Sequence, residues 1–279
     1  MPARKPRLLF GPAGIPLSAS EPSTEAGIRR VRELGLDCME VEFVQGVRMK
    51  EEQALRVGEI ARELKVSLSA HAPYFINLNA KEEDKIRASK ERLLQAARIS
   101  ALFGGTVVVF HPAYYLDLPP EEALERVREN LAEVAARIRA EGLKILLAPE
   151  TTGKTTQLGT LEEVLKLCKG MEGVVPCIDF AHIHARTGRY NSYEEFLEIL
   201  DLVAETLGKK ALSNLHIHVS GIEGGKGGEK RHLNLRESDF RYEDLMRALK
   251  ERKVGGLVIS ESPNREEDAL LLKEVYERL

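Results

Sequence analysis

The chain has 279 residues, a formal net charge of −3, 43% hydrophobic residues and 30% charged residues. This composition is that of a globular chain long enough to bury a substantial core. No stretch approaches the roughly 18 uninterrupted apolar residues that a membrane span needs, and MPARKPRLLF lacks the apolar core and cleavage site of a signal peptide. We therefore expect a cytoplasmic protein. The small net charge argues against a protein that coats nucleic acid generally, and it leaves room for a local basic surface.

The three cysteines, Cys38, Cys168 and Cys177, stand far apart and form no CxxC pair. This spacing argues against a disulfide framework and against a thiolate zinc site.

Short apolar runs alternate with longer amphipathic segments from one end of the chain to the other. The expected strands are residues 7–11, 38–44, 66–71, 106–111, 144–150, 174–179, 211–219 and 256–261. Helical patterns stand between them, notably residues 85–103, 119–142 and 192–208. The second of these segments begins PPEEALERV, which places Pro at a helix start and acids after it, as suits the N-terminal dipole.

Eight successive strand–helix units predict a (β/α)8 TIM barrel, an α/β fold, as a single domain over residues 1–279. A doubly wound open sheet is the alternative. It has little support, because no GxGxxG follows the first strand.

Histidines and acids gather where the expected strands end. The histidines are His71, His111, His182, His218 and His232, and the acids are Glu150, Asp179 and Glu261. A lone histidine at a strand end is more often structural than a ligand, but all eight side chains would converge on one barrel mouth. Acids at this density repel one another unless cations neutralise them, and nitrogen and oxygen ligands without thiolates suit Zn²⁺ or Mn²⁺. The sequence therefore predicts a multinuclear metal site.

Two HxH pairs occur, and the alternation of side chains along a strand resolves one of them. His216 and His218 share a face, and His218 lies nearer the mouth, so we expect His218 to be the ligand and His216 a deeper residue. His182 is expected in the loop after the sixth strand, and His232 in the loop after the seventh. We expect His184 to be a structural residue at a helix start or on the surface.

A set of motifs then stands in order along the chain: AHAPYFIN, VVFHPAYY, LAPETTGK, CIDFAHIHARTGRY, HVSGIE, EKRHLNL and ISESPN. The ordered set resembles endonuclease IV, the metal-dependent apurinic/apyrimidinic endonuclease of the xylose-isomerase-like barrel superfamily, over essentially the whole chain. The resemblance implies one metal held by His71, His111 and Glu150, a second held by Glu150, Asp179, His218 and Glu261, and a third held by His182 and His232. Two or three Zn²⁺ ions per chain are implied, with Mn²⁺ as the other candidate, and Glu150 and Glu261 are the expected catalytic carboxylates.

The chain departs from the family pattern near the last histidine. The family has Asp-x-His there, whereas this chain has Lys230, Arg231 and His232, with Glu229 the nearest acid. We therefore expect the third metal to be held more weakly than the other two. Ser220 and Gly221 replace the family's asparagine and aspartate, and PETTGK stands where the family often has ENTAG.

The resemblance implies a DNA-repair enzyme that hydrolyses the phosphodiester 5′ to abasic sites in duplex DNA, and we expect it to act as a monomer. Tyr74 and Asn77 match the pair that the family inserts near the lesion, and Gln45 or Arg48 is the expected second-loop contact. Further cations fall in loops on the same face: Lys154, Arg186, Arg189, Lys226, Lys230 and Arg231. The competing function is a divalent-metal-dependent sugar isomerase or epimerase of the same superfamily, for which Glu150, Asp179, His218 and Glu261 alone would hold one metal.

Overall fold

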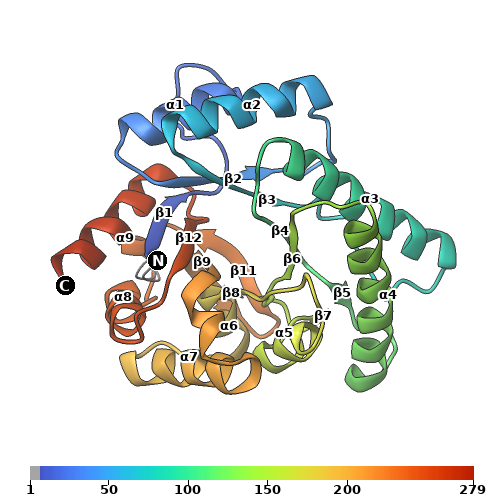
Figure 1. Ribbon diagram of the computed structural model, residues 1–279. Helices are drawn as coiled ribbons and strands as arrows, with labels where there is room; N and C mark the ends of the chain where they lie inside the picture. The colour runs from blue at the N-terminus through green and yellow to red at the C-terminus, as the bar shows by residue number, and fades with distance from the viewer. Residues whose placement is uncertain (1–6) are drawn as a thin grey trace.

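Eight parallel strands form the inner layer of the computed structural model, which describes residues 7–279 (Figure 1). They are β1 (Leu8–Pro12), β2 (Cys38–Glu42), β3 (Ser67–His71), β4 (Val107–Phe110), β6 (Leu146–Pro149), β8 (Cys177–Asp179), β9 (Leu215–Val219) and β12 (Gly256–Ser260). Four strands pair in the order β1-β12-β9-β8, and four in the order β2-β3-β4-β6. Single parallel bridges, Ala13 with Glu40 and Glu150 with Cys177, join the two sets on both sides. The sheet therefore closes, which confirms the barrel and excludes the open sheet.

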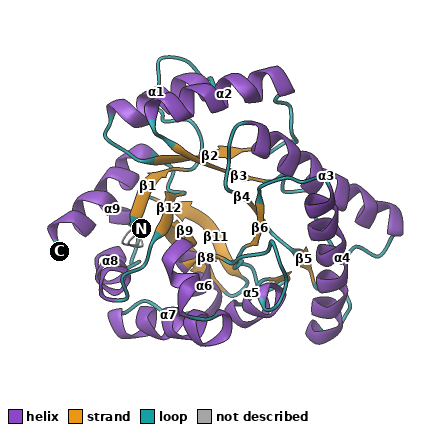
Figure 2. Cartoon of the chain, viewed as in Figure 1, coloured by secondary structure: helices purple, strands orange, loops and turns teal. Residues whose placement is uncertain are grey.

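Helices surround the strands as an outer layer (Figure 2). They are α1 (Thr24–Glu33), α2 (Glu51–Leu64), α3 (Glu83–Leu102), α4 (Pro120–Ala140), α5 (Leu161–Cys168), α6 (Phe180–Thr187), α7 (Tyr193–Leu207), α8 (Tyr242–Glu251) and α9 (Glu266–Arg278). In α4 the buried residues Val127, Leu131, Val134 and Ile138 recur every three or four positions, so one stripe faces the barrel. Within residues 7–279, no helix is long and apolar enough to cross a membrane.

Two short antiparallel pairs of strands follow the carboxyl ends of the barrel strands. β5 (Ala113–Tyr114) pairs with β7 (Gln157–Leu158), and β10 (Gly221–Gly225) pairs with β11 (Gly228–Leu233). The expected strand 211–219 begins only at Leu215, because residues Lys209–Asn214 form the 3-10 helix η1. The second short helix, η2 (Leu235–Glu237), follows the β10–β11 hairpin.

Two histidines that we expected in loops lie in regular structure. His182 lies in the first turn of α6, because the Asp179 side chain accepts a hydrogen bond from the His182 backbone N–H at 2.7 Å and starts the helix directly after β8. His232 lies on β11, because the segment after β9 folds back on itself as a hairpin.

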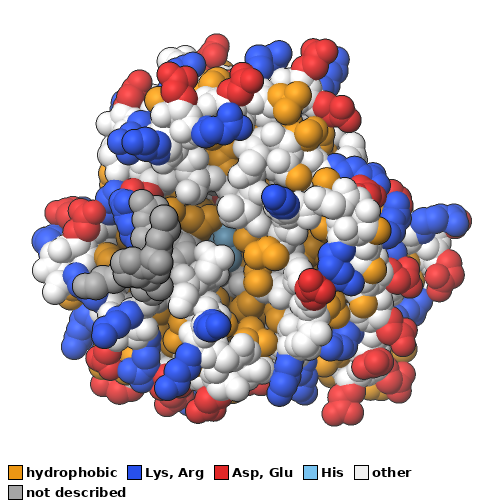
Figure 3. Space-filling model, viewed as in Figure 1, with side chains coloured by type: hydrophobic (Ala, Val, Ile, Leu, Met, Phe, Trp, Pro, Cys, Tyr) orange, Lys and Arg blue, Asp and Glu red, His pale blue; other side chains and the backbone are white. Residues whose placement is uncertain are grey.

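Charged side chains of both signs are interspersed around the edge of the face shown in Figure 3, and apolar side chains and a histidine lie near its centre. Neither sign dominates this face, in keeping with the net charge of −3.

Candidate metal centre

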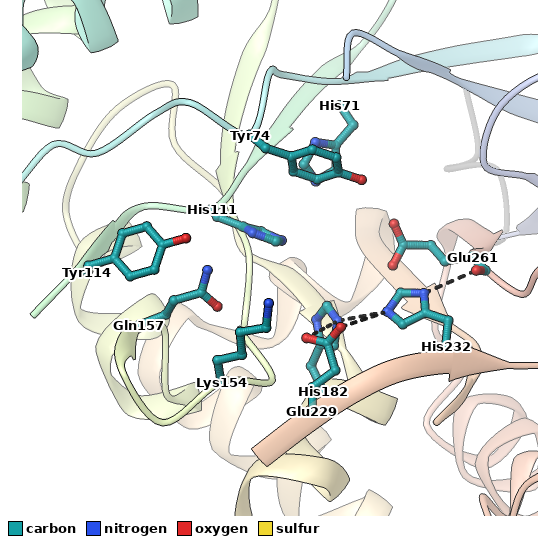
Figure 4. A pocket seen from close by; sticks show the side chains of 10 residues that line it. All are labelled: His71, Tyr74, His111, Tyr114, Lys154, Gln157, His182, Glu229, His232 and Glu261. Atoms are coloured by element: carbon teal, nitrogen blue, oxygen red, sulfur yellow. Dashed lines mark hydrogen bonds and ion pairs between the residues drawn. The ribbon is translucent and has the colours of Figure 1, made fainter. Parts of the chain in front are cut away.

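The carboxyl ends of the strands and the β10–β11 hairpin enclose a cavity of about 390 Å³ (Figure 4). It is lined by His71, Tyr74, His111, Tyr114, Lys154, Gln157, His182, Glu229, His232 and Glu261. Glu150, Asp179 and His218 are fully buried beside it. All eight predicted metal ligands therefore meet at one mouth. Seven of them fall into three clusters that could hold a metal, and His218 forms further groups with Glu40 and Glu261 and with Cys177 and His216.

The first cluster consists of His71, His111 and Glu150. Both histidines place Nε2 3.1 Å from the same carboxylate oxygen, Oε2 of Glu150. The Nδ1 of His71 lies 2.8 Å from the carbonyl oxygen of Ala72, which can only accept, so Nδ1 carries the proton. In the neutral imidazole the Nε2 lone pair then faces a carboxylate, an arrangement that requires a cation or an added proton between them.

The second cluster contains Glu150, Asp179, His182 and Glu261. His218 adjoins it. Nδ1 of His218 lies 3.3 Å from Oε1 of Glu150 and 3.4 Å from Oε1 of Glu261. Oδ2 of Asp179 and Oε2 of Glu261 are buried and have no hydrogen-bond partner within the described chain. Buried carboxylate oxygens without donors are costly, so this cluster fits a divalent cation.

The third cluster joins His182 and His232, whose Nε2 atoms lie 3.1 Å apart. Nδ1 of His182 is 3.0 Å from the Thr151 carbonyl, and Nδ1 of His232 is 3.1 Å from the Glu261 carbonyl. Both Nδ1 atoms therefore donate, and two Nε2 lone pairs point at each other. Such a contact is repulsive unless a cation lies between the rings.

Glu229 completes this third cluster. Its carboxylate lies 3.5 Å from Nε2 of His182 and 3.6 Å from Nε2 of His232. For zinc bonds of about 2.0–2.1 Å, tetrahedral ligand atoms stand about 3.3 Å apart, so the three side chains fit one ion with shifts of a few tenths of an ångström. The sequence alone does not show whether the Glu229 carboxylate reaches His182 and His232.

A β-bulge explains how Glu229 reaches. Glu223 of β10 pairs with Arg231 and Gly224 pairs with Glu229, so Lys230 has no partner across the hairpin. Glu229 and His232 are three residues apart, so in a regular strand their side chains would point to opposite faces. The unpaired Lys230 adds one residue to β11, and this bulge brings Glu229 and His232 to the same face. Lys230 is exposed, and its ammonium lies 3.3 Å from Glu223, away from the cluster. The Lys230 ammonium is therefore directed away from this third cluster and toward the Glu223 carboxylate.

Gly153, in the PETTGK motif, makes room for the same cluster. A Cβ at this position would lie 2.5 Å from the Cβ of Glu229 and 3.0 Å from the ring of His182. Its carbonyl also accepts a hydrogen bond from the Glu229 backbone N–H at 2.9 Å, which ties the loop to β11. Only glycine fits at this position.

Without metal, protons take the place of cations at this mouth. Burial lowers the pKa of His71, but the hydrogen bond to Glu150 and the charge of Glu42 outweigh it and raise the pKa to about 10. Burial lowers the pKa of His182 as well, and the carboxylates of Asp179 and Glu150 raise it well above its usual range. Burial raises the pKa of Asp179 to about 6. In the metal-free site, the raised pKa values of His71 and His182 mean that protonated histidines supply the positive charge.

The pKa values of two carboxylates, Glu261 and Glu150, are lowered by the neighbouring histidines. Burial raises the pKa of Glu261, but the charge of His218 outweighs it and lowers the pKa to about 2. Burial likewise raises the pKa of Glu150, and the charges on His111 and His218 bring it well below its usual range. Both groups are therefore carboxylates at neutral pH, the form that binds metals.

The two remaining histidines lie outside these three clusters, and His184 lies in the last turn of α6 instead of at a helix start. His216 is buried below the mouth, where its Nε2 donates to Oε2 of Glu40 at 2.8 Å. His184 lies in α6, with Nδ1 3.0 Å from the Arg189 carbonyl and Nε2 3.4 Å from Asp239.

Sequence reasoning missed two acids of β2, the buried Glu40 and the half-buried Glu42. Glu42 pairs in register with His71, and burial raises its pKa to about 8. A signal was present in CMEVEFV, where two acids stand two residues apart in an otherwise apolar strand. Alternation places both on one face.

Of the side chains proposed to contact DNA, Tyr74 is half exposed at the mouth, with its ring centroid 5.6 Å from that of His71. Lys154 lines the cavity. Arg48 is exposed and donates to the Gln45 side chain at 3.1 Å. Asn77 is half-buried, and its Oδ1 accepts from the backbone N–H groups of Asn79 and Tyr114.

Two arginines are already engaged by the chain itself. The Arg186 guanidinium donates to the carbonyls of Lys154 and Gln157 at 2.7 and 2.9 Å and to the Tyr115 hydroxyl at 3.1 Å. It holds the loop after β6 in place, so we assign it no contact with DNA. Arg231 is exposed on β11 and donates to Glu223 at 2.8 Å.

The chain is a closed TIM barrel whose mouth gathers histidines and carboxylates in groups that could hold a metal ion. Residues 28–279 match the xylose isomerase-like TIM barrel family, and the chain belongs to that family.

Among its relatives, an uncharacterized protein of Methanocaldococcus jannaschii is 46% identical over 277 residues, covering 99% of each chain. A probable endonuclease 4 of Mycoplasma pneumoniae is 25% identical over 72% of this chain and 69% of its own length.

Two solved structures have nearly equal similarity to the fold. Endonuclease IV from Thermus thermophilus gives a TM-score of 0.72 at 21% identity, covering 96% of this chain and 98% of its own. A D-tagatose 3-epimerase-like protein gives 0.71 at 20% identity, covering 96% of each chain.

Proposed function

We propose that this protein is a metal-dependent endonuclease of the endonuclease IV type, which hydrolyses the phosphodiester 5′ to abasic sites in duplex DNA during base-excision repair. The observation that supports it most directly is the third cluster, in which His182, His232 and Glu229 converge in addition to two other ligand sets. One metal suffices to hold a ketose. A site for three is suited to a phosphodiester, whose attacked oxygens and leaving oxygen each carry charge.

The donor sets fit two or three Zn²⁺ ions, with Mn²⁺ as the alternative. Such ions supply Lewis-acid polarisation of phosphoryl oxygens and activation of water. His71, His111 and Glu150 would hold the first ion, Glu150, Asp179, His218 and Glu261 the second, and His182, Glu229 and His232 the third.

The chain's own residues perform the remaining tasks. Glu150 belongs to two clusters and fixes the distance between them, because each of its oxygens contacts a different set of histidines. Lys154, which reaches the cavity from the loop after β6, supplies a positive charge suited to a phosphate. Tyr74 presents a half-exposed ring beside the cavity, where it can fill the space left by a missing base. An abasic nucleotide leaves the stack at little cost, because no base pair must be broken.

A sugar epimerase or isomerase is the second candidate. Its support is the set Glu150, Asp179, His218 and Glu261, which by itself can hold one metal, and the fold similarity to a D-tagatose 3-epimerase-like protein. Under this reading His182, Glu229 and His232 would have no task.

The test is incubation of the purified protein with a labelled duplex carrying one abasic site, with and without a chelator. A single chelator-sensitive nick on the 5′ side of the lesion, absent from intact duplex, is the expected result. The same preparation is assayed with a panel of ketoses. Epimerisation without nicking would replace the proposed function by the second candidate.

A further inference from the structure

A buried polar layer lies directly beneath the metal centre, around Glu40 of β2, which is 0% exposed. Oε2 of Glu40 accepts hydrogen bonds from the Ser69 hydroxyl at 2.7 Å and from Nε2 of His216 at 2.8 Å. Oε1 lies 2.9 Å from Nε2 of His218. This last contact lies off the line of the N–H and is an ion-pair contact, not a directed hydrogen bond.

Both ring nitrogens of His218 face carboxylates, and the contact of Nδ1 with Oε1 of Glu150 at 3.3 Å has the geometry of a hydrogen bond. Nδ1 also lies 3.4 Å from Oε1 of Glu261. With a cation bound beside Glu150 and Glu261, Nδ1 needs its lone pair for that cation. The proton of the neutral ring then belongs on Nε2, which faces the Glu40 carboxylate. We propose that Glu40 is a positioning residue that holds His218 in the tautomer that binds a metal through Nδ1.

The topology explains why a side chain is needed here. His71, His182 and His232 are each oriented by a backbone carbonyl, and each presents Nε2 to its cluster. His218 lies within β9, which pairs with β8 on one side and with β12 on the other. His71 also lies on a strand paired on both sides, but it is the last residue of β3 and uses the carbonyl of Ala72 just beyond that strand. The carbonyl of Val219, which follows His218, accepts instead from the Glu261 backbone N–H. The partner of His218 therefore comes from another strand, and His218 presents Nδ1.

Ser69 and His216 hold Glu40 in turn. Their two directed hydrogen bonds leave Oε1 as the oxygen nearest His218, and they stabilise the carboxylate in a buried position. Carboxylates that orient ligating histidines typically strengthen metal binding 10–100-fold. The inference rests on the metal centre of the proposed function, and it does not require cleavage of DNA.

The test replaces Glu40 by Gln. The amide keeps one acceptor for Ser69 and His216 and turns its NH₂ toward His218, which favours a lone pair on Nε2 and a proton on Nδ1. Titration with Co²⁺, followed by visible absorption and by metal analysis, should show one ion bound 10–100-fold more weakly than in the parent. The spectra of the other ions should stay unchanged.

Glu163→Gln is the matched control, because Glu163 is also a buried carboxylate, accepting from the Gly159 and Thr160 backbone N–H groups at 2.9 Å and from Tyr115, but contacts no ligand. It should lower stability and leave Co²⁺ affinity at the parent value. Parent-like binding of every ion by Glu40→Gln would overturn the proposal, as would equal weakening in the control.

A measurement on the parent chain serves if Glu40→Gln does not fold. In the zinc-loaded protein, ¹⁵N-labelled histidine spectra should show His218 with a proton on Nε2 and none on Nδ1, the reverse of His71, His182 and His232. The same tautomer in all four rings would refute the inference. If the tautomers are as predicted but no abasic duplex is nicked, the proposed function fails and the role of Glu40 stands.

Discussion

Replacement of Glu229 by Gln should remove the third metal and leave the other two bound. Gln keeps the size of the side chain and loses the only negative charge in the cluster of His182, Glu229 and His232. Without that carboxylate the ion would have two nitrogen ligands from the chain, and their Nε2 atoms lie 3.1 Å apart.

The magnitude follows from the role of the residue. Loss of a group that only orients a ligand typically costs 10–100-fold in metal affinity, so loss of a ligand should cost at least that. Such a change corresponds to at least about 1.4–2.7 kcal/mol. The affinity of the first two clusters should not move, because neither contains Glu229.

The assay is equilibrium dialysis against buffered zinc, followed by metal and protein analysis. Three ions per chain are expected for the parent and two for Glu229→Gln at the same free zinc concentration. Glu223→Gln is the control, because Glu223 is a carboxylate of the same hairpin that pairs with Lys230 and Arg231 and faces no cluster. Three ions in Glu229→Gln, held as tightly as in the parent, would refute the reasoning.

Register variants test the bulge in the same assay. Deletion of Lys230 leaves Glu229 two residues before His232, and regular alternation then places both on one face, so the third ion should remain. Gly153→Ala should lose it, because the added Cβ would lie 2.5 Å from that of Glu229. Loss of the ion on deletion of Lys230, together with its retention in Gly153→Ala, would show that the hairpin does not have this register.

Three other predictions concern catalysis, recognition and pH. Glu261→Gln should abolish nicking and leave the fold intact, because the change falls on a metal carboxylate and not on the core; parent-like turnover, with the fold checked by circular dichroism, would remove Glu261 from the site. Tyr74→Ala should reduce the preference for abasic over intact duplex, measured by competition binding, with metal content unchanged; selective loss of metal would assign Tyr74 to the centre. The metal-free protein should lose stability as pH rises from 6.5 to about 10, because the raised pKa of His71 means that its contribution is complete below 6.5 and is lost through about 10. The free energy of unfolding, from denaturant titrations, should fall by at most about 1.4 kcal/mol per pH unit for this group, and the metal-loaded protein should not show this fall; a flat profile without metal would contradict the pKa of His71.

The sequence by itself determined the barrel and the composition of its mouth. Eight apolar runs separated by amphipathic helices favour a parallel sheet covered by helices, and parallel strands bring their carboxyl ends to one side whether the sheet closes or stays open. Histidines and acids placed after those strands, such as His71, His111 and Glu150, therefore had to meet. The ligands most securely predicted are those whose backbone lies on or next to a barrel strand.

Tertiary structure decided what depends on hydrogen-bond partners and on register. Whether Glu229 reaches His232 depends on a bulge at Lys230, which regular alternation along a strand does not reveal. Arg186 is held by carbonyls of a loop about 30 residues earlier in the chain, so its charge could not be assigned from its position alone. Which nitrogen of a histidine binds a metal depends on what faces the other nitrogen, and for His218 that partner is Glu40, 178 residues away.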